Sequence, residues 1–278
     1  MASVTPTDPV KAVQAASLII IRDGVVRDDG RSIEVLMVER HGAIEFAGGA
    51  YVFPGGKVQM TDATRRLTGR FPGLQDLPLR MAAIRETFEE TGVLFARRQG
   101  SRRIAARAEQ RLLIRRVASR RHLRDRALLV EFQRHGLTLA ADLLIPFSHW
   151  ITPVIRRSRF DTMFYLAVMP AGQMVQHDGN EAVGAFWVAP EDMVGRHGYD
   201  IKTLMFPQRL NLLELSRART VTEALEIGVR RPVVPILPEL EKTDEGIFAH
   251  IPEEAGYGGS RFLFAKPPEN TGGTAQKA

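Results

Sequence analysis

The segment RETFEETGV, residues 85–93, carries the strongest signal in this chain. Apolar and charged residues in and before it alternate at the spacing of an amphipathic helix, and Gly92 offers a C-terminal cap. On such a helix Glu86, Glu89 and Glu90 lie three or four positions apart and converge on one side. The segment therefore predicts a helix that presents a cluster of three carboxylates.

Two explanations account for these acidic residues. One is a solvated acidic face with a surface ion pair between Arg85 and Glu89, which adds little stability. The other is a cation site, because clustered carboxylates repel one another and hard divalent cations such as Mg²⁺ prefer carboxylate oxygens beside substrate phosphates. The segment FPGGKV, residues 53–58, favours the cation site. A turn at Gly55 and Gly56 leaves room for a phosphate chain to approach the backbone.

The rest of the chain alternates between strand and helix patterns. Runs of β-branched residues bounded by turn residues predict strands, and apolar residues at helical spacing predict helices. The expected strands are 17–22, 33–40, 148–152, 163–169 and 183–188. The expected helices are 79–92, two within 101–134, 191–196, 210–218 and 221–229. This order of elements indicates an α/β or α+β domain.

Composition excludes several classes of protein. The chain of 278 residues has no cysteine, which excludes disulfides, thiolate metal sites and a cysteine nucleophile, and we expect a cytoplasmic protein. The apolar run Ala15–Ile21 is far too short to span a bilayer, and residues 1–9 lack the pattern of a signal peptide. We therefore expect no membrane partner.

Positive charge is concentrated in one segment. Residues 97–126 contain twelve arginines and no lysine, against Glu109 and Asp125. Such a concentration of positive charge is one feature of proteins that bind nucleic acid. A solvated helix face, or a helical insert whose polar face attracts a polyanionic substrate, explains the run as well. Because nucleic-acid binding alone does not require the acidic helix, we disfavour nucleic acid as a partner.

The combination of a glycine turn and an RExxEExG helix resembles the signature of the Nudix hydrolases. In that signature a glycine is followed by five residues and a glutamate, whereas here Gly56 is followed by five residues and Asp62. A further 22 residues separate Asp62 from Arg85, many more than the family's usual spacing. The split signature resembles the subgroup that contains the mammalian peroxisomal coenzyme A diphosphatase. Further stretches with this likeness are GGAYVFPGG at 48–56, WITP at 150–153, RSRFDT at 157–162, HDGNE at 177–181 and FWV at 186–188.

The resemblance implies a Nudix-type α/β/α sandwich with a mixed sheet and an added helical insert. We expect a single domain over residues 15–230, with one insert at 57–79 and a helical insert at about 97–135. The flanking segments are expected as extensions, residues 1–14 and 231–278, with a disordered tail from about 266.

The resemblance also assigns catalytic roles. Glu86, Glu89 and Glu90 would bind Mg²⁺ or Mn²⁺, and Arg85 would belong to the same catalytic set. The general base would be either Glu86 or a distal acid, for which Glu181 at the start of an expected strand is the best candidate.

Substrate would be held by the glycine turn and by a basic cluster. The expected substrate-binding residues are Gly55, Gly56, Arg156, Arg157 and Arg159. Guanidinium groups bind phosphate oxygens in a bidentate manner, which suits the diphosphate and 3′-phosphate of coenzyme A. A cationic patch at a strand end is an equally weighted alternative for the arginines.

The expected function is that of a metal-dependent diphosphohydrolase. Its most favoured substrate is coenzyme A or acyl-coenzyme A, cleaved to adenosine 3′,5′-bisphosphate and (acyl-)phosphopantetheine. Hydrolysis of ADP-sugars or dinucleotide polyphosphates is the first alternative, and a non-catalytic nucleotide- or RNA-binding module is the second. The expected partner is therefore a small nucleotide substrate, and a homodimer is compatible with the sequence.

Overall fold

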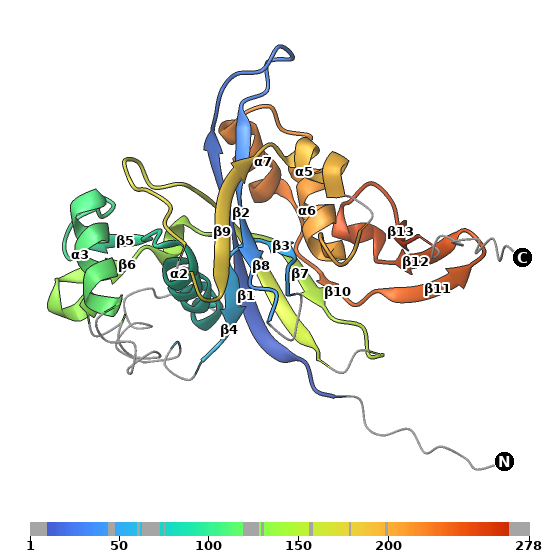
Figure 1. Cartoon of the computed structure of the whole chain (residues 1–278), viewed down its shortest axis with the longest axis horizontal. Helices are drawn as coiled ribbons and strands as arrows, with labels where there is room; N and C mark the ends of the chain where they lie inside the picture. Colours follow the sequence, from blue (N-terminus) through green and yellow to red (C-terminus); the bar gives the residue numbers. More distant parts are fainter. Residues whose placement is uncertain are drawn as a thin grey trace, which may run out of the picture.

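The computed structural model describes residues 10–43, 48–59, 62, 73–74, 76–118, 128, 131–155, 158–177, 179–197 and 200–266. Within these residues the chain forms a central eight-stranded mixed sheet with helices on both faces (Figure 1). This confirms the α/β architecture predicted from the sequence. The strands of the sheet are β1 (Val13–Asp23), β2 (Ile33–Arg40), β3 (Tyr51–Val52), β4 (Gly55–Lys57), β7 (Ile145–Ile151), β8 (Phe160–Val168), β9 (Ala182–Val188) and β10 (Pro235–Ile236).

Two hydrophobic cores lie on opposite faces of this sheet. Helix α2 (Leu77–Thr91) covers one face, and its buried residues Leu77, Met81 and Ile84 belong to the first core. The second core is covered by α5 (Pro190–His197), α6 (Phe206–Leu215) and α7 (Val221–Arg230), which lie together on the other side of the sheet in Figure 1. No helix in the described part of the chain has the length and apolar character needed to cross a membrane.

Strand β1 lies at the centre of the sheet because it is apolar on both faces. It pairs in parallel with β8 along most of its length, and antiparallel with β2 near one end and with β4 near the other. Leu18 and Ile20 point into the core beneath α2, whereas Ile19 and Ile21 point into the opposite core. A strand covered on both faces needs a nearly continuous apolar run, and Ala15–Ile21 supplies it.

Most of the predicted elements are confirmed. The five expected strands correspond to β1, β2, β7, β8 and β9, and four of the expected helices correspond to α2, α5, α6 and α7. Helix α6 begins four residues earlier than predicted, at Phe206, because Pro207 fits the first turn of a helix. The very short strands β3 and β4 follow no periodic pattern and were not predicted.

The arginine-rich segment contains helix α3 (Arg107–Ala118), as predicted. Of the second helix predicted within 101–134, residues 128 and 131–134 are described and are helical. Two strands that the pattern did not predict, β5 (Ala96–Arg98) and β6 (Leu137–Leu139), pair with each other and bring the two ends of this segment together. Most of the insert expected at 57–79 lies outside the described residues.

Residues 231–265 contain structure that the sequence pattern did not predict. Besides β10 they form a three-stranded sheet of β11 (Glu239–Thr243), β12 (Gly246–His250) and β13 (Arg261–Ala265), and a 3₁₀ turn η4 (Glu253–Ala255). Ile236, Ala249 and Ile251 are buried in the core beneath α5, α6 and α7. This segment therefore shares a core with the central sheet. The tail expected from about 266 lies beyond the described residues.

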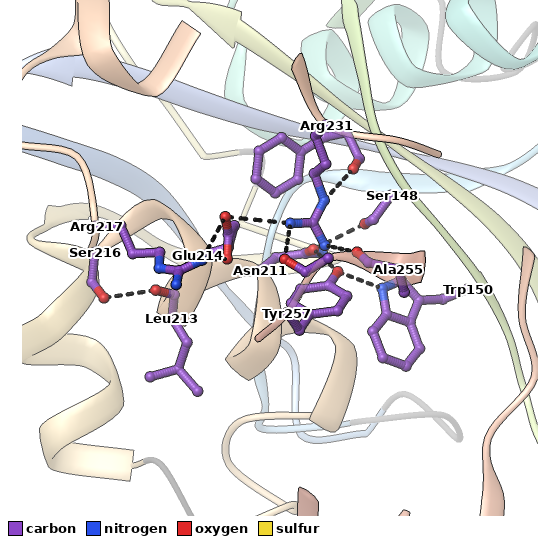
Figure 2. A network of polar contacts seen from close by, with 12 residues as sticks. Ser148, Trp150, Asn211, Leu213, Glu214, Ser216, Arg217, Arg231, Ala255 and Tyr257 are labelled. Atoms are coloured by element: carbon purple, nitrogen blue, oxygen red, sulfur yellow. Dashed lines mark hydrogen bonds and ion pairs between the residues drawn. The ribbon is translucent and has the colours of Figure 1, made fainter. Parts of the chain in front are cut away.

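Arg231 and Tyr257 tie the C-terminal segment to the central sheet, as Figure 2 shows. The buried guanidinium of Arg231 donates from Nε to the carbonyl oxygen of Phe147 in β7 at 3.0 Å. The Tyr257 hydroxyl accepts a hydrogen bond from Trp150 Nε1 at 3.1 Å and donates one to Asn211 Oδ1 at 2.7 Å. These bonds join β7, α6 and the segment after η4 into one polar network beside a hydrophobic core.

Replacing Tyr257 with phenylalanine tests this network. The change leaves the buried Trp150 Nε1–H without its acceptor, and we expect the free energy of unfolding to fall by about 1–3 kcal/mol. Urea denaturation measures the difference. Tyr51→Phe is the matched control, because the Tyr51 ring packs on Phe186 and His197 and its hydroxyl has no hydrogen bond among the described residues. Equal losses in the two variants would contradict the anchoring role.

Candidate active site

Helix α2 has well-defined ends that fix its acidic residues. Pro78 lies in the first turn, where the missing N–H costs no helical hydrogen bond. Gly92 ends the helix in the left-handed conformation, with φ at 68°, and its N–H donates to the carbonyl oxygen of Phe88 at 2.8 Å. Between these ends the helix carries Arg85 and the three glutamates that the sequence predicts as metal ligands.

Arg85 is the centre of the site, and its side chain is only 2% exposed. Its Nε and Nη2 donate to the two carboxylate oxygens of Asp62 at 3.1 and 3.0 Å, and Nη2 also donates to the Lys57 carbonyl oxygen at 2.9 Å. Its Nη1 donates to Glu86 at 2.8 Å and to Glu89 at 3.3 Å. One guanidinium therefore joins the turn after β4 to two of the predicted metal ligands. The predicted contact between Arg85 and Glu89 is present, but the arginine is buried, so the contact is not the surface ion pair of a solvated face.

Asp62 is a site residue that the sequence analysis placed at the signature position without giving it a role. It is fully buried, and besides Arg85 its carboxylate accepts the backbone N–H of Gln59 at 2.8 Å. The aspartate thus receives the arginine although 22 residues separate the two in sequence. The five-residue spacing from Gly56, which matches the Nudix signature, pointed to this position, although the acid is one carbon shorter than the glutamate of the signature.

Gly55 and Gly56 allow the backbone of β1 and the glutamates of α2 to approach β4 closely. The Gly55 N–H donates to the buried carboxylate of Glu90 at 3.0 Å, and a Cβ at Gly55 would lie 2.4 Å from the Ala16 carbonyl oxygen of β1. A Cβ at Gly56 would lie 2.4 Å from the carboxyl carbon of Glu86. Gly55 therefore needs glycine for the close fit of β4 against β1, whereas a side chain at Gly56 would displace the carboxylate of Glu86. Their expected contact with substrate stays a prediction.

The negative charge of the three carboxylates on α2 is not balanced by the positive groups around them. Burial raises the pKa of Glu90 to about 8 and that of Glu89 to about 7, and it also raises the pKa of Glu86. The charges of neighbouring carboxylates add to this effect. Arg85 counteracts the shift at Glu86 and Glu89, and the Gly55 N–H counteracts it at Glu90, but neither cancels it. A further cation would therefore be favourable here.

Glu181, the residue before β9, and Arg40, the last residue of β2, lie within electrostatic reach of this helix. The negative charge of Glu181 contributes to the raised pKa of all three glutamates, and its carbonyl oxygen accepts the His41 N–H at 2.9 Å. The next residue, Ala182, pairs with Arg40. The tertiary structure thus brings the distal acid proposed from the sequence into electrostatic reach of α2.

Arg40 is a residue that the sequence analysis did not single out. Its positive charge lowers the pKa of Glu90, so it lies close to the carboxylate cluster. Its Nε is buried and has no hydrogen-bond partner among the described residues. The available signal was its position as the last residue of a predicted strand, at the edge from which the glycine-rich segment departs.

Arg159 is held by the backbone. Its Nε donates to the carbonyl oxygen of Thr152 at 3.0 Å, its Nη1 donates to that of Val10 at 2.7 Å, and the residue is 9% exposed. These contacts fix the start of β1 against the loop between β7 and β8. Its expected contact with a phosphate stays a prediction, and Arg156 and Arg157 lie outside the described residues.

The side chains of α2 fit a hard divalent cation, because Mg²⁺ and Mn²⁺ prefer carboxylate oxygens as ligands. The positive charges near these three carboxylates do not balance their negative charge. As the side chains stand, no three acidic or histidine residues in the described ranges are gathered closely enough to hold an ion. Glu86 and Glu89 lie against Arg85, and Glu90 lies against Gly55. Binding an ion therefore requires these carboxylates to come closer together.

Comparison with known proteins shows similarity to Nudix hydrolases. The family model of the NUDT19 Nudix domain matches residues 65–217, more than half of the chain. The chain is 30% identical over 202 residues to the putative nudix hydrolase 7 of Caenorhabditis elegans, which covers 72% of this chain and 62% of that protein. It is 28% identical over 229 residues to the acyl-coenzyme A diphosphatase NUDT19 of Gallus gallus. This alignment covers 66% of this chain and 61% of that protein. The chain thus spans about three fifths of the length of these two relatives.

A solved structure shares the fold. The NUDIX hydrolase from Alicyclobacillus acidocaldarius superposes with a TM-score of 0.63 and is 28% identical in sequence. The match covers 78% of this chain and 96% of that one. This likeness confirms the type of sandwich that the sequence led us to expect.

Replacing Asp62 with alanine tests the ion pair at the centre of the site. The change leaves the guanidinium of Arg85 buried without its main partner, so we expect the free energy of unfolding to fall by about 3–5 kcal/mol. Asp142→Ala is the control, because Asp142 pairs with Arg97 at the surface and its side chain is 47% exposed. That variant should lose less than about 1 kcal/mol in the same denaturation experiment. Similar losses in both would show that the buried pair does not organise the site.

The raised pKa values predict how stability depends on pH in metal-free protein. The folded chain holds a proton on Glu90 up to about pH 8, whereas in the unfolded chain the pKa is the ordinary 4.5. Because the folded state binds more protons in this window, rising pH destabilises it. We expect Glu90→Gln, which cannot ionise, to become progressively more stable than the wild type between about pH 5 and pH 8. Urea denaturation in the presence of EDTA measures this difference. A difference that is constant or shrinks with pH would contradict the shift.

Proposed function

The chain belongs to the Nudix hydrolases of the NUDT19 type, and from that premise we propose that it hydrolyses the diphosphate linkage of coenzyme A or of an acyl-coenzyme A. The products would be adenosine 3′,5′-bisphosphate and (acyl-)phosphopantetheine. The name of the Gallus gallus relative supports this choice of substrate. The structural observation that supports the proposal is the group of three carboxylates on α2, one buried and two partly buried, whose pKa values are raised by burial and by one another's charge.

We assign Mg²⁺ or Mn²⁺ to Glu86, Glu89 and Glu90. When bound, the ion supplies positive charge to the diphosphate oxygens and polarises the attacking water. The carboxylates bind it only in their ionised form, so binding displaces the protons that Glu89 and Glu90 hold near neutral pH. We therefore expect the affinity for the metal ion to increase as the pH rises through neutrality.

The protein's own residues orient the reacting groups. Arg85, held by Asp62, keeps the side chains of Glu86 and Glu89 on the side of α2 that faces the β4 turn. Arg40 adds a positive charge near Glu90, suited to a phosphate oxygen of the substrate. The proton of the attacking water goes to Glu86 or to Glu181, both of which belong to the same electrostatic cluster.

A substrate panel tests this function. The purified chain with Mg²⁺ or Mn²⁺ should release adenosine 3′,5′-bisphosphate from coenzyme A, and the panel also contains acyl-coenzyme A, ADP-ribose and diadenosine polyphosphates. Glu86→Gln should lower kcat/KM by about 10²–10⁴-fold, because it removes a ligand charge or the general base. Glu226→Gln should leave activity unchanged, because Glu226 pairs with Arg230 at the exposed end of α7.

The outcomes of the panel separate the alternatives. Cleavage of ADP-ribose or dinucleotides without cleavage of any coenzyme A species would overturn the substrate but keep the chemistry. Binding of nucleotides without cleavage of any compound would show a non-catalytic module. Retention of full activity in Glu86→Gln would overturn the assignment of the site to α2.

A further inference from the structure

Five exposed arginines form a positively charged surface on α3 and on the turn before it. Within the described part of the chain, none of their side chains has a hydrogen bond or an ion pair. They are Arg102, Arg103, Arg107, Arg111 and Arg115, and we call them the arginine surface. The last three recur every four residues, so they share one side of the helix at steps of about 6 Å.

The acidic side chains near this surface are already paired with other arginines. Nε of Arg98 donates to Glu109 at 2.8 Å, and Nη2 of Arg97 donates to Asp142 at 2.8 Å. In the rest of the described ranges, the exposed arginines whose side chains also lack a partner are Arg196 and Arg219. The unpaired arginine charge that the structure describes is therefore concentrated on the arginine surface.

Buried contacts hold α3 against the C-terminal end of α2, beside which it lies in Figure 1. Gln110 is 1% exposed, and its Nε2 donates to the carbonyl oxygens of Gly92 at 2.9 Å and of Met174 at 2.6 Å. Ile114 also lies against Gly92, since a Cβ added there would come within 2.9 Å of its Cδ1. Because Gly92 follows Glu90 by two residues, the helix that carries the arginine surface adjoins the end of the acidic motif.

The arginine surface is close enough to influence the site through its charge. Arg111 follows Gln110, whose amide contacts Gly92, so the backbones of Arg111 and Glu90 lie within about 20 Å of each other. Electrostatic interactions in water extend about 8 Å at physiological ionic strength and about 30 Å at 0.01 M. The surface is thus placed to act on a charged molecule while it approaches the site.

The charge of the site makes such an influence useful. Glu86, Glu89, Glu90 and Glu181 form one electrostatic cluster, and their negative charge repels an anion at long range. Coenzyme A and its acyl esters are strongly anionic, because each carries a diphosphate and a 3′-phosphate. A positive surface beside the site offsets the repulsion and raises the rate of encounter.

We propose that the arginine surface attracts polyanionic substrates to the active site and favours the more highly charged among them. This inference rests on the proposed function. The five side chains act at a distance, on association, and are not catalytic residues. The occupant is the substrate because α3 adjoins α2 and because the charges of substrate and surface are complementary.

Steady-state kinetics of the double variant Arg107→Gln/Arg111→Gln test the inference. At an ionic strength of about 0.01 M, kcat/KM for coenzyme A should fall about three- to tenfold while kcat stays within about twofold. At about 0.5 M salt, screening should reduce the difference to less than about twofold. The variant Arg107→Lys/Arg111→Lys keeps the charge and should retain kcat/KM within about twofold under both conditions.

The matched control is Arg196→Gln/Arg219→Gln. It also removes two exposed arginines without a side-chain partner in the described ranges, but from α5 and the start of α7, on the other side of the sheet. It should change kcat/KM by less than about twofold, because only the position of the lost charge differs. Thermal unfolding of each variant establishes that it is folded, and Arg111→Gln alone replaces the double variant if that one does not fold.

Binding of the product adenosine 3′,5′-bisphosphate gives a readout that is independent of turnover. In stopped-flow experiments at low ionic strength, its association rate constant should fall about three- to tenfold in Arg107→Gln/Arg111→Gln, and its dissociation rate constant should stay within about twofold. Dephospho-coenzyme A lacks the 3′-phosphate, so its kcat/KM should fall less than that of coenzyme A.

Several results would overturn the inference. They are unchanged association, a loss confined to kcat or to dissociation, a loss that persists at high salt, and an equal loss in the control. Loss of binding to a single-stranded RNA oligonucleotide with unchanged association of the product would assign the surface to nucleic acid instead.

Failure of the proposed function is recognised separately, because hydrolysis by the wild type reports on the function and the difference between variants reports on the surface. If the wild type cleaves ADP-ribose instead, a smaller salt-dependent loss is expected for that compound, which carries fewer charges. An unchanged kcat/KM at low ionic strength for whichever substrate the wild type cleaves would overturn the inference.

Discussion

The ion pair between Arg85 and Asp62 is the interaction on which the site depends. A buried guanidinium is costly unless its donors are satisfied, and here they are shared between Asp62, the Lys57 carbonyl oxygen and two glutamates of α2. The pair therefore holds β4, the turn after it and α2 in one arrangement. The 22 residues between Asp62 and Arg85 do not disturb it, because the entropy of closing a loop grows only slowly with its length.

The site that this pair organises is electrostatically incomplete by itself. Burial beside other carboxylates raises the pKa of Glu89 and Glu90 into the neutral range, which is unfavourable for the metal-free fold. The excess of negative charge on these glutamates favours the binding of a divalent cation. The bound cation in turn attracts the negatively charged diphosphate of the substrate.

Local patterns in the sequence predicted the longer strands and helices. Strands β1, β2, β7, β8 and β9 were found because they carry runs of β-branched and other apolar residues bounded by turn residues, and helix α2 was found because its apolar residues recur at helical spacing. The strands between residues 235 and 265 were missed because they are two to five residues long and lie among prolines and glycines. Their burial comes from distant partners such as β7 and α6, which no local pattern reveals.

The sequence by itself determined the chemistry of this protein, because the acidic motif of α2 places Arg85, Glu86, Glu89 and Glu90 by local helical geometry alone. Only the tertiary structure decided which distant groups surround that motif. Asp62 lies against Arg85, and Glu181 and Arg40 come close through the pairing of β2 with β9. Strand pairing depends on contacts between residues far apart in the chain, so their meeting is a property of the folded sheet.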